Sequence, residues 1–142
     1  MKLLVIDGQG GGMGKALVQA LKADMPRRQV LALGTNAAAT AAMLKAGADL
    51  AATGEAAICY QCQGADLILG AMGILQAHSM LGEISPAIAA AVSASPAQKV
   101  LLPMERCGLH VAGVGKQTLE EAIRGAVAIA RELCEERMDS HE

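Results

Sequence analysis

A glycine-rich segment between an apolar strand and a helix constrains this chain more than any other feature of its sequence. The largely apolar run at residues 2–6 ends at Asp7 and Gly8, as expected of a strand buried on both faces. Apolar positions at helical spacing follow over residues 15–22. The segment between them holds five glycines, at positions 8, 10, 11, 12 and 14. A strand, a tight loop and a helix in this order form the opening unit of a parallel α/β sheet.

The same alternation of strand and helix continues along the chain. Further strands are predicted at residues 29–33, 50–53, 67–70 and 99–102, and further helices at 37–46, 85–94 and 118–137. Strands separated by helices of this length imply right-handed crossovers and helices on both faces of the sheet. We therefore expect a single domain over residues 1–142. Its predicted class is α/β, a three-layer, doubly wound, Rossmann-like fold with a mostly parallel sheet in the order 3-2-1-4-5.

A sixth strand is predicted at the edge of this sheet. The segment from Leu109 to Val114 again has strand character, and residues 103–108 separate it from the fifth strand. Because six residues cannot contain a crossover helix, the extra strand is expected to pair antiparallel.

The position of the glycine loop predicts a phosphate site. In open α/β sheets, ligands bind beyond the carboxyl ends of the strands, where glycines let main-chain amides approach a phosphate at a helix N-terminus. We expect a phosphate-bearing small molecule, NAD(P) or another nucleotide, with its phosphate on the loop and its sugar or base near the second strand. An alternative is that some of these glycines serve the chain reversal alone. The predicted binding residues are Gly8, Gln9, Gly10, Gly11, Gly12, Met13, Gly14, Lys15, Gly34, Thr35, Asn36, Thr53, Gly70 and Gly73.

The spacing of Gly8, Gly12 and Gly14 resembles the cofactor loop of short-chain dehydrogenases. Two other features of a dehydrogenase do not match. The acidic residue expected after the second strand to bind a ribose is replaced by residues 34–36, Gly-Thr-Asn. Tyr60, the single tyrosine, is followed four residues later by glycine rather than by the lysine of the catalytic pair. The loop therefore predicts nucleotide binding and leaves the reaction open.

Four segments, residues 5–12, 32–37, 52–55 and 79–84, carry a second resemblance. Through them the chain is similar to a small bacterial family of uncharacterised single-domain proteins with a Rossmann-like fold. This resemblance implies the fold and the positions of the loops, and it implies no known activity.

Three side chains are candidates for catalysis: Cys107, Glu55 and Glu83. Cys107 follows the fifth strand beside Arg106, a neighbour that favours a reactive thiolate. Glu55 and Glu83 lie in or near loops at the carboxyl edge, where a general base would be placed. Each candidate also has a structural interpretation, as a buried thiol or as an acid at a helix N-terminus. An enzyme, a non-catalytic ligand-binding or regulatory module, and a small structural or oligomeric protein all stay open.

Cysteine and histidine spacing does not predict a metal site. Cys59, Cys62, Cys107 and His110 are of the residue types that bind zinc. A strand at His110 would turn its side chain away from Cys107, so free thiols are expected instead.

Composition limits the kinds of partner. The net charge of −2, the absence of Phe and Trp and the lack of long basic runs argue against nucleic acid as a partner. The apolar runs are too short for a membrane span, and the apolar stretch at residues 3–6 is too short for a signal peptide. We expect a cytoplasmic protein that forms a homodimer or another homo-oligomer.

Overall fold

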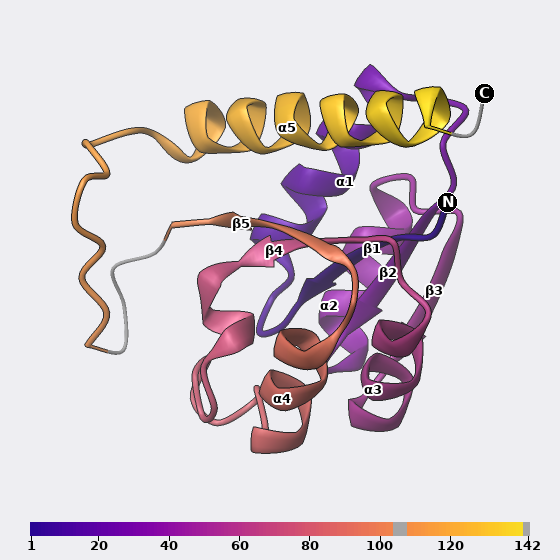
Figure 1. Cartoon of the computed structure of the whole chain (residues 1–142). Helices are drawn as coiled ribbons and strands as arrows, with labels where there is room; N and C mark the ends of the chain where they lie inside the picture. The colour runs from indigo at the N-terminus through magenta and orange to yellow at the C-terminus, as the bar shows by residue number, and fades with distance from the viewer. Residues whose placement is uncertain (104–107, 141–142) are drawn as a thin grey trace.

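The structure is a computed structural model that describes residues 1–103 and 108–140 (Figure 1). The predicted alternation of strands and helices is confirmed. The elements in chain order are β1 (Leu3–Asp7), α1 (Gly12–Asp24), β2 (Val30–Gly34), α2 (Ala37–Lys45), β3 (Leu50–Thr53), α3 (Glu55–Gln63), β4 (Leu67–Ala71), the 3₁₀ helix η1 (Met72–Leu75), α4 (Pro86–Ala94), β5 (Gln98–Leu102) and α5 (Leu119–Asp139).

The five strands form one parallel sheet in the predicted order, β3-β2-β1-β4-β5. β1 lies at the centre, with Leu4 opposite Leu31 of β2 and Ile68 of β4. Every residue of β1 and β4 is buried, because helices cover both faces of the sheet. The order reverses between β1 and β4, so the loops after these two strands diverge to opposite faces.

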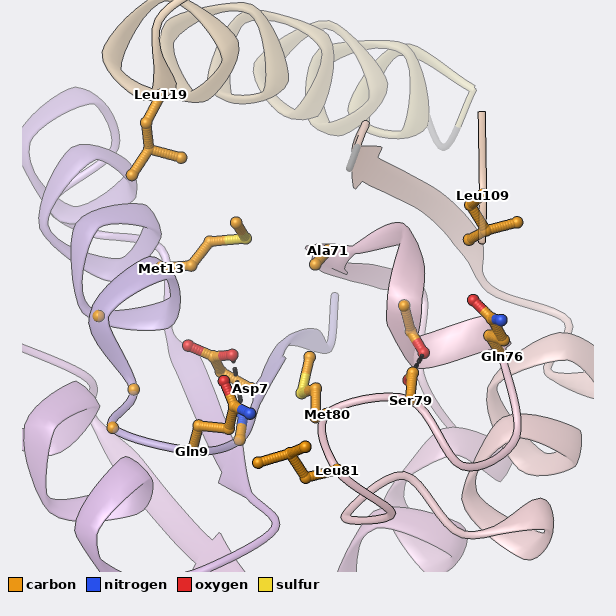
Figure 2. A pocket seen from close by; sticks show the side chains of 15 residues that line it. Asp7, Gln9, Met13, Ala71, Gln76, Ser79, Met80, Leu81, Leu109 and Leu119 are labelled. Carbon is orange, nitrogen blue, oxygen red and sulfur yellow. Dashed lines mark hydrogen bonds between the residues drawn. The ribbon is translucent and has the colours of Figure 1, made fainter. Parts of the chain in front are cut away.

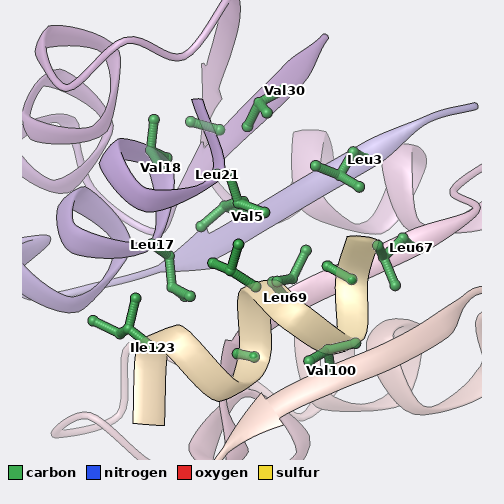
Figure 3. Close-up of a cluster of buried hydrophobic side chains, with 14 of the residues drawn as sticks. Leu3, Val5, Leu17, Val18, Leu21, Val30, Leu67, Leu69, Val100 and Ile123 are labelled. Atoms are coloured by element: carbon green, nitrogen blue, oxygen red, sulfur yellow. The ribbon is translucent and has the colours of Figure 1, made fainter. Parts of the chain in front are cut away.

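Alternate residues of the strands pack against different helices. Leu3 and Val5 belong to a core shared with α1 and α5, in which Leu17 and Ile123 are buried (Figure 3). The intervening residues of β1 pack into a second core, with buried side chains from α3 and α4, among them Ile58. The side-chain period of two in a strand produces this division and gives the three layers of the fold.

The predicted sixth strand is wrong. Described residues 108–114 form turns and irregular backbone, and no strand pairs with the free edge of β5 in the described part of the chain. Gly108 and Gly113 have φ of 78° and 84°, which breaks the extended conformation that the apolar pattern suggested. Val114 is 44% exposed, so the pattern marks a surface segment instead.

The helix starts predicted at residues 85 and 118 are confirmed, and the residue at each of these positions caps its helix. The Ser85 and Thr118 side chains accept hydrogen bonds from the amides of Ile88 and Glu121. None of the helices in the described ranges is long and apolar enough to cross a membrane.

Candidate functional site

A cavity of about 640 Å³ lies at the carboxyl edge of the sheet, between the ends of β1 and β4. Figure 2 shows Met13 and Leu119 on one side of it, and Gln76, Ser79 and Leu109 on the other. This is where the strand order reverses, the usual place for a ligand in an open α/β sheet. Among the residues that the structure describes, those that line the cavity are Asp7, Gly8, Gln9, Gly10, Gly11, Gly12, Met13, Ala71, Gly73, Gln76, Ser79, Met80, Leu81, Leu109 and Leu119.

Asp7 organises the glycine loop from the end of β1. One carboxylate oxygen accepts the Gly8 amide at 2.8 Å, and the other accepts the Gly14 amide, in the first turn of α1, at 2.6 Å. Burial raises the pKa of the Asp7 carboxyl, while these two amides act to lower it and the charge of Glu83 acts to raise it. A carboxylate of the protein therefore occupies part of the positive end of α1.

The five loop glycines fall into two groups. At Gly8, Gly11 and Gly14 an added Cβ would meet another atom within 3 Å, for example Ala39 Cα at 2.8 Å from Gly11 and Met43 Sδ at 2.5 Å from Gly14. These three glycines are explained by close packing of the loop against its neighbours. At Gly10 and Gly12 an added Cβ would meet nothing within 4 Å. Packing within the described chain does not explain why these two positions lack a side chain.

Three main-chain amides of the loop have no acceptor among the described residues. Asp7 takes the amides of Gly8 and Gly14, as described above, and Gly11 donates to the Gly8 carbonyl at 3.0 Å. The amides of Gly10, Gly12 and Met13 donate to no acceptor among the residues that the structure describes. Since all three residues line the cavity, the loop offers three donors beside open space.

Glu83 closes the other side of the loop, toward β2. Its Oε1 accepts three hydrogen bonds, from the Thr35 hydroxyl at 2.6 Å, the Asn36 side-chain amide at 2.7 Å and the Gln9 main-chain amide at 2.9 Å. The bond from Thr35, and next the bond from the Gln9 amide, lower the pKa of the Glu83 carboxyl most. Burial raises this pKa by less, and the Asn36 bond lowers it a little further. The Asn36 amide also donates to the Gln9 carbonyl at 2.9 Å. We call Gln9, Thr35, Asn36 and Glu83 the clamp.

The loop between η1 and α4 forms the rim of the cavity and has an unusual backbone. His78, Met80 and Leu81 have φ of 69°, 56° and 56°, a left-handed conformation that costs roughly 1–3 kcal/mol for each residue that is not glycine. Leu81 is 94% exposed although it is a leucine, and Figure 2 shows it at the rim beside Met80. The buried Ser79 hydroxyl donates to the Gly73 carbonyl and holds this loop against η1.

The other predicted binding residues lie around this site without entering it, apart from Gly73, which lines the cavity. Lys15 is exposed on α1. Gly34 lets the chain pass close to Thr40, and the Thr53 hydroxyl donates to the Thr40 hydroxyl at 2.7 Å. Gly70 gives β4 room beside the Ile6 carbonyl, which would lie 2.8 Å from an added Cβ.

The predicted catalytic residues are not brought together at the cavity. Glu55, at the start of α3, accepts a hydrogen bond from the Ser85 hydroxyl and does not line the cavity. Glu83 is held in the clamp, as described above. Cys107 lies outside the residues that the structure describes.

Several residues of the cavity were not found by sequence reasoning. Gln76, Ser79, Met80 and Leu81 follow η1, where the sequence has no regular pattern to place them. Leu119 was expected only as a residue of the helix at 118–137, yet it is 49% exposed at the cavity wall. Its position one residue after the Thr118 cap, ahead of the buried residues of α5 that begin at Ile123, was the one available signal.

Cys62 and Cys134 are buried free thiols, and Cys59 is a half-buried one. Burial raises the pKa of the Cys62 thiol to about 11 and raises that of Cys134 as well. No cluster of three or more His, Cys, Asp or Glu side chains within residues 1–103 and 108–140 is arranged to hold a metal ion.

The fold and the cavity together define a Rossmann-like α/β domain with a concave site at its switch point. The family model described as "Domain of unknown function (DUF3842)" matches residues 2–135. The chain belongs to this family. Searches of the curated proteins and of the solved structures gave no match.

Proposed function

We propose that this domain binds a phosphate-bearing small molecule of the nucleotide class in the cavity between β1 and β4. The proposal rests mainly on Gly10 and Gly12, which have open space where a side chain would stand and which line the cavity with unused amides. A phosphate oxygen accepts such donors at a helix N-terminus, where the helix dipole adds to the attraction. The space that two absent side chains leave is where the phosphate group would lie.

The rest of the cavity suits an apolar or flat ligand group. Met13, Leu109 and Leu119 supply aliphatic walls, and Met80 adds its side chain at the rim. A cavity of about 640 Å³ lies within the roughly 300–1,000 Å³ range of small-molecule sites. A base or a similar ring would therefore lie between aliphatic side chains rather than on an aromatic platform.

The carboxylate of Asp7 shapes the charge that the site accepts. An ionised Asp7 below the loop repels an incoming phosphate, whereas a protonated Asp7 does not. Because burial already raises the pKa of Asp7, a bound anion would raise it further. Binding is therefore expected to be coupled to proton uptake, which calorimetry in buffers of different ionisation enthalpy measures directly.

The proposal is one of binding, and it names no reaction. The three hydrogen bonds to Glu83 and the Ser85 bond to Glu55 favour structural roles for these two carboxylates.

The test is titration calorimetry with 5′-mononucleotides and inorganic phosphate. Wild type should bind at least one nucleotide, and the double variant Gly10→Ala/Gly12→Ala should weaken that binding at least tenfold, because two methyl groups fill the phosphate position. Gly125→Ala is the matched control: it adds a methyl group with nothing within 4 Å, but on α5 away from the cavity. Unchanged affinity in the double variant, or no binding by wild type, would refute the proposal.

A further inference from the structure

The two halves of the carboxyl edge differ in a way that bears on ligand size. In a dinucleotide-binding domain, the pyrophosphate lies over the first loop, and one nucleoside extends from there past the end of the second strand. In this chain the cavity lies toward β4, and the side toward β2 carries the clamp.

The clamp leaves no passage between the first loop and the end of β2. The Asn36 side chain donates to the Gln9 carbonyl at 2.9 Å, so the two loops are joined directly. Glu83, from the loop before α4, lies across the end of β1 and accepts hydrogen bonds from residues of both loops. Thr35 and Asn36, the side chains expected to contact a sugar or base, are therefore already engaged within the protein.

Packing around Gly8 confirms that this side is filled. A Cβ added to Gly8 would lie 2.7 Å from Thr35 Oγ1, 3.0 Å from Met80 Sδ and 3.1 Å from Glu83 Oε1. Contacts this short leave no room for a ribose between the loop and the clamp. Neither Thr35, Asn36 nor Glu83 lines the cavity.

We infer that the site takes a mononucleotide-sized phosphate compound, and that the second half of a dinucleotide gains no contact in it. The inference rests on the proposed function, which it narrows: the phosphate lies on the amides of Gly10, Gly12 and Met13, and the ligand extends toward β4, Leu109 and Leu119. The clamp takes the place of the missing acidic residue after β2, since its carboxylate lies beside the same loop but binds protein donors instead of a ribose.

The experiment compares matched ligands on the intact chain. Titration calorimetry measures the mononucleotide that binds most tightly and the dinucleoside diphosphate that carries two copies of the same nucleoside. The dinucleotide should bind no more tightly than the mononucleotide. A dinucleotide that binds at least tenfold more tightly overturns the inference. If the Gly10→Ala/Gly12→Ala variant also weakens the binding of that dinucleotide, the proposed function is still supported. Failure of every nucleotide to bind wild type overturns both.

A variant of the clamp gives a second readout. Thr35→Val removes the shortest of the three bonds to Glu83, so it should lower the melting temperature but change the dissociation constant of the mononucleotide by less than twofold. A tenfold loss of affinity in this variant would mean that the ligand uses the β2 side, and the inference would be wrong.

Discussion

Replacing Gly14 and Gly12 by alanine separates the glycines that the fold needs from those that the cavity needs. Both residues lie in the first turn of α1, so each alanine gains a similar helix propensity, up to about 1 kcal/mol relative to glycine. At Gly14 the new methyl carbon would meet Met43 Sδ at 2.5 Å and Asp7 Cβ at 2.8 Å, both inside the packed region between β1, α1 and α2. Overpacking of this kind costs about 1–3 kcal/mol, and Gly12 carries no such cost.

The free energy of unfolding of Gly14→Ala should therefore lie about 1–3 kcal/mol below that of Gly12→Ala. For a chain of this size about 3 °C corresponds to 1 kcal/mol, so the melting temperatures should differ by roughly 3–9 °C. Urea unfolding followed by circular dichroism measures the free energies, and differential scanning calorimetry the temperatures. Equal stability of the two variants, or a less stable Gly12→Ala, would refute the division of the loop into packing and open positions.

Three further predictions concern the carboxylates and the rim. The pKa of the Asp7 carboxyl is raised by burial, so the stabilisation that comes from its protonation is present below the unfolded pKa of 3.8 and is lost as pH rises through the folded pKa. The difference in melting temperature between wild type and Asp7→Asn should therefore change across this pH window. A difference that stays constant with pH would contradict the prediction. The pKa of the Glu83 carboxyl is lowered by its hydrogen bonds, so stability is lost as pH falls below 4.5 through the folded pKa. Glu83→Gln should remove that part of the acid sensitivity and lower the free energy of unfolding at pH 7 by about 1–3 kcal/mol. A variant whose stability depends on acid pH as wild type does would argue against the prediction. Leu81→Ser should change stability by less than about 0.5 kcal/mol because the side chain is 94% exposed, and a larger loss in chemical denaturation would show that the leucine packs against the protein.

The fold could be predicted from sequence because its signals are local. The run at residues 2–6 and the glycines after it mark β1 and the start of α1, and the Ser85 and Thr118 caps mark two further helix starts. The prediction of a sixth strand was wrong because the apolar pattern at residues 109–114 does not indicate whether a partner strand is present. Gly108, just before this segment, and Gly113, within it, have positive φ and interrupt the extended backbone that a strand requires.

The candidate site could be predicted in position but not in shape. A loop at the carboxyl end of a central strand follows from the strand and helix order alone. The contact between Thr35 and Glu83 joins residues 48 apart in the sequence, and no local pattern predicts it. The left-handed backbone at Met80 and Leu81 is equally invisible, since neither residue type favours that conformation. The sequence therefore indicated where the glycine loop lies in the fold, at the end of β1, and could not show which side of it is open.

The cavity wall that α5 contributes has a mechanical consequence. Leu109 and Leu119 stand on either side of the exposed segment that includes Lys116, a site for trypsin. A cut there would leave α5 attached through its buried face, including Ile123 and Ala130, and through the ion pair between Arg131 and Asp24. A ligand in contact with both leucines would then touch both fragments. The fragments of the cleaved protein would therefore dissociate less readily with ligand bound than without it.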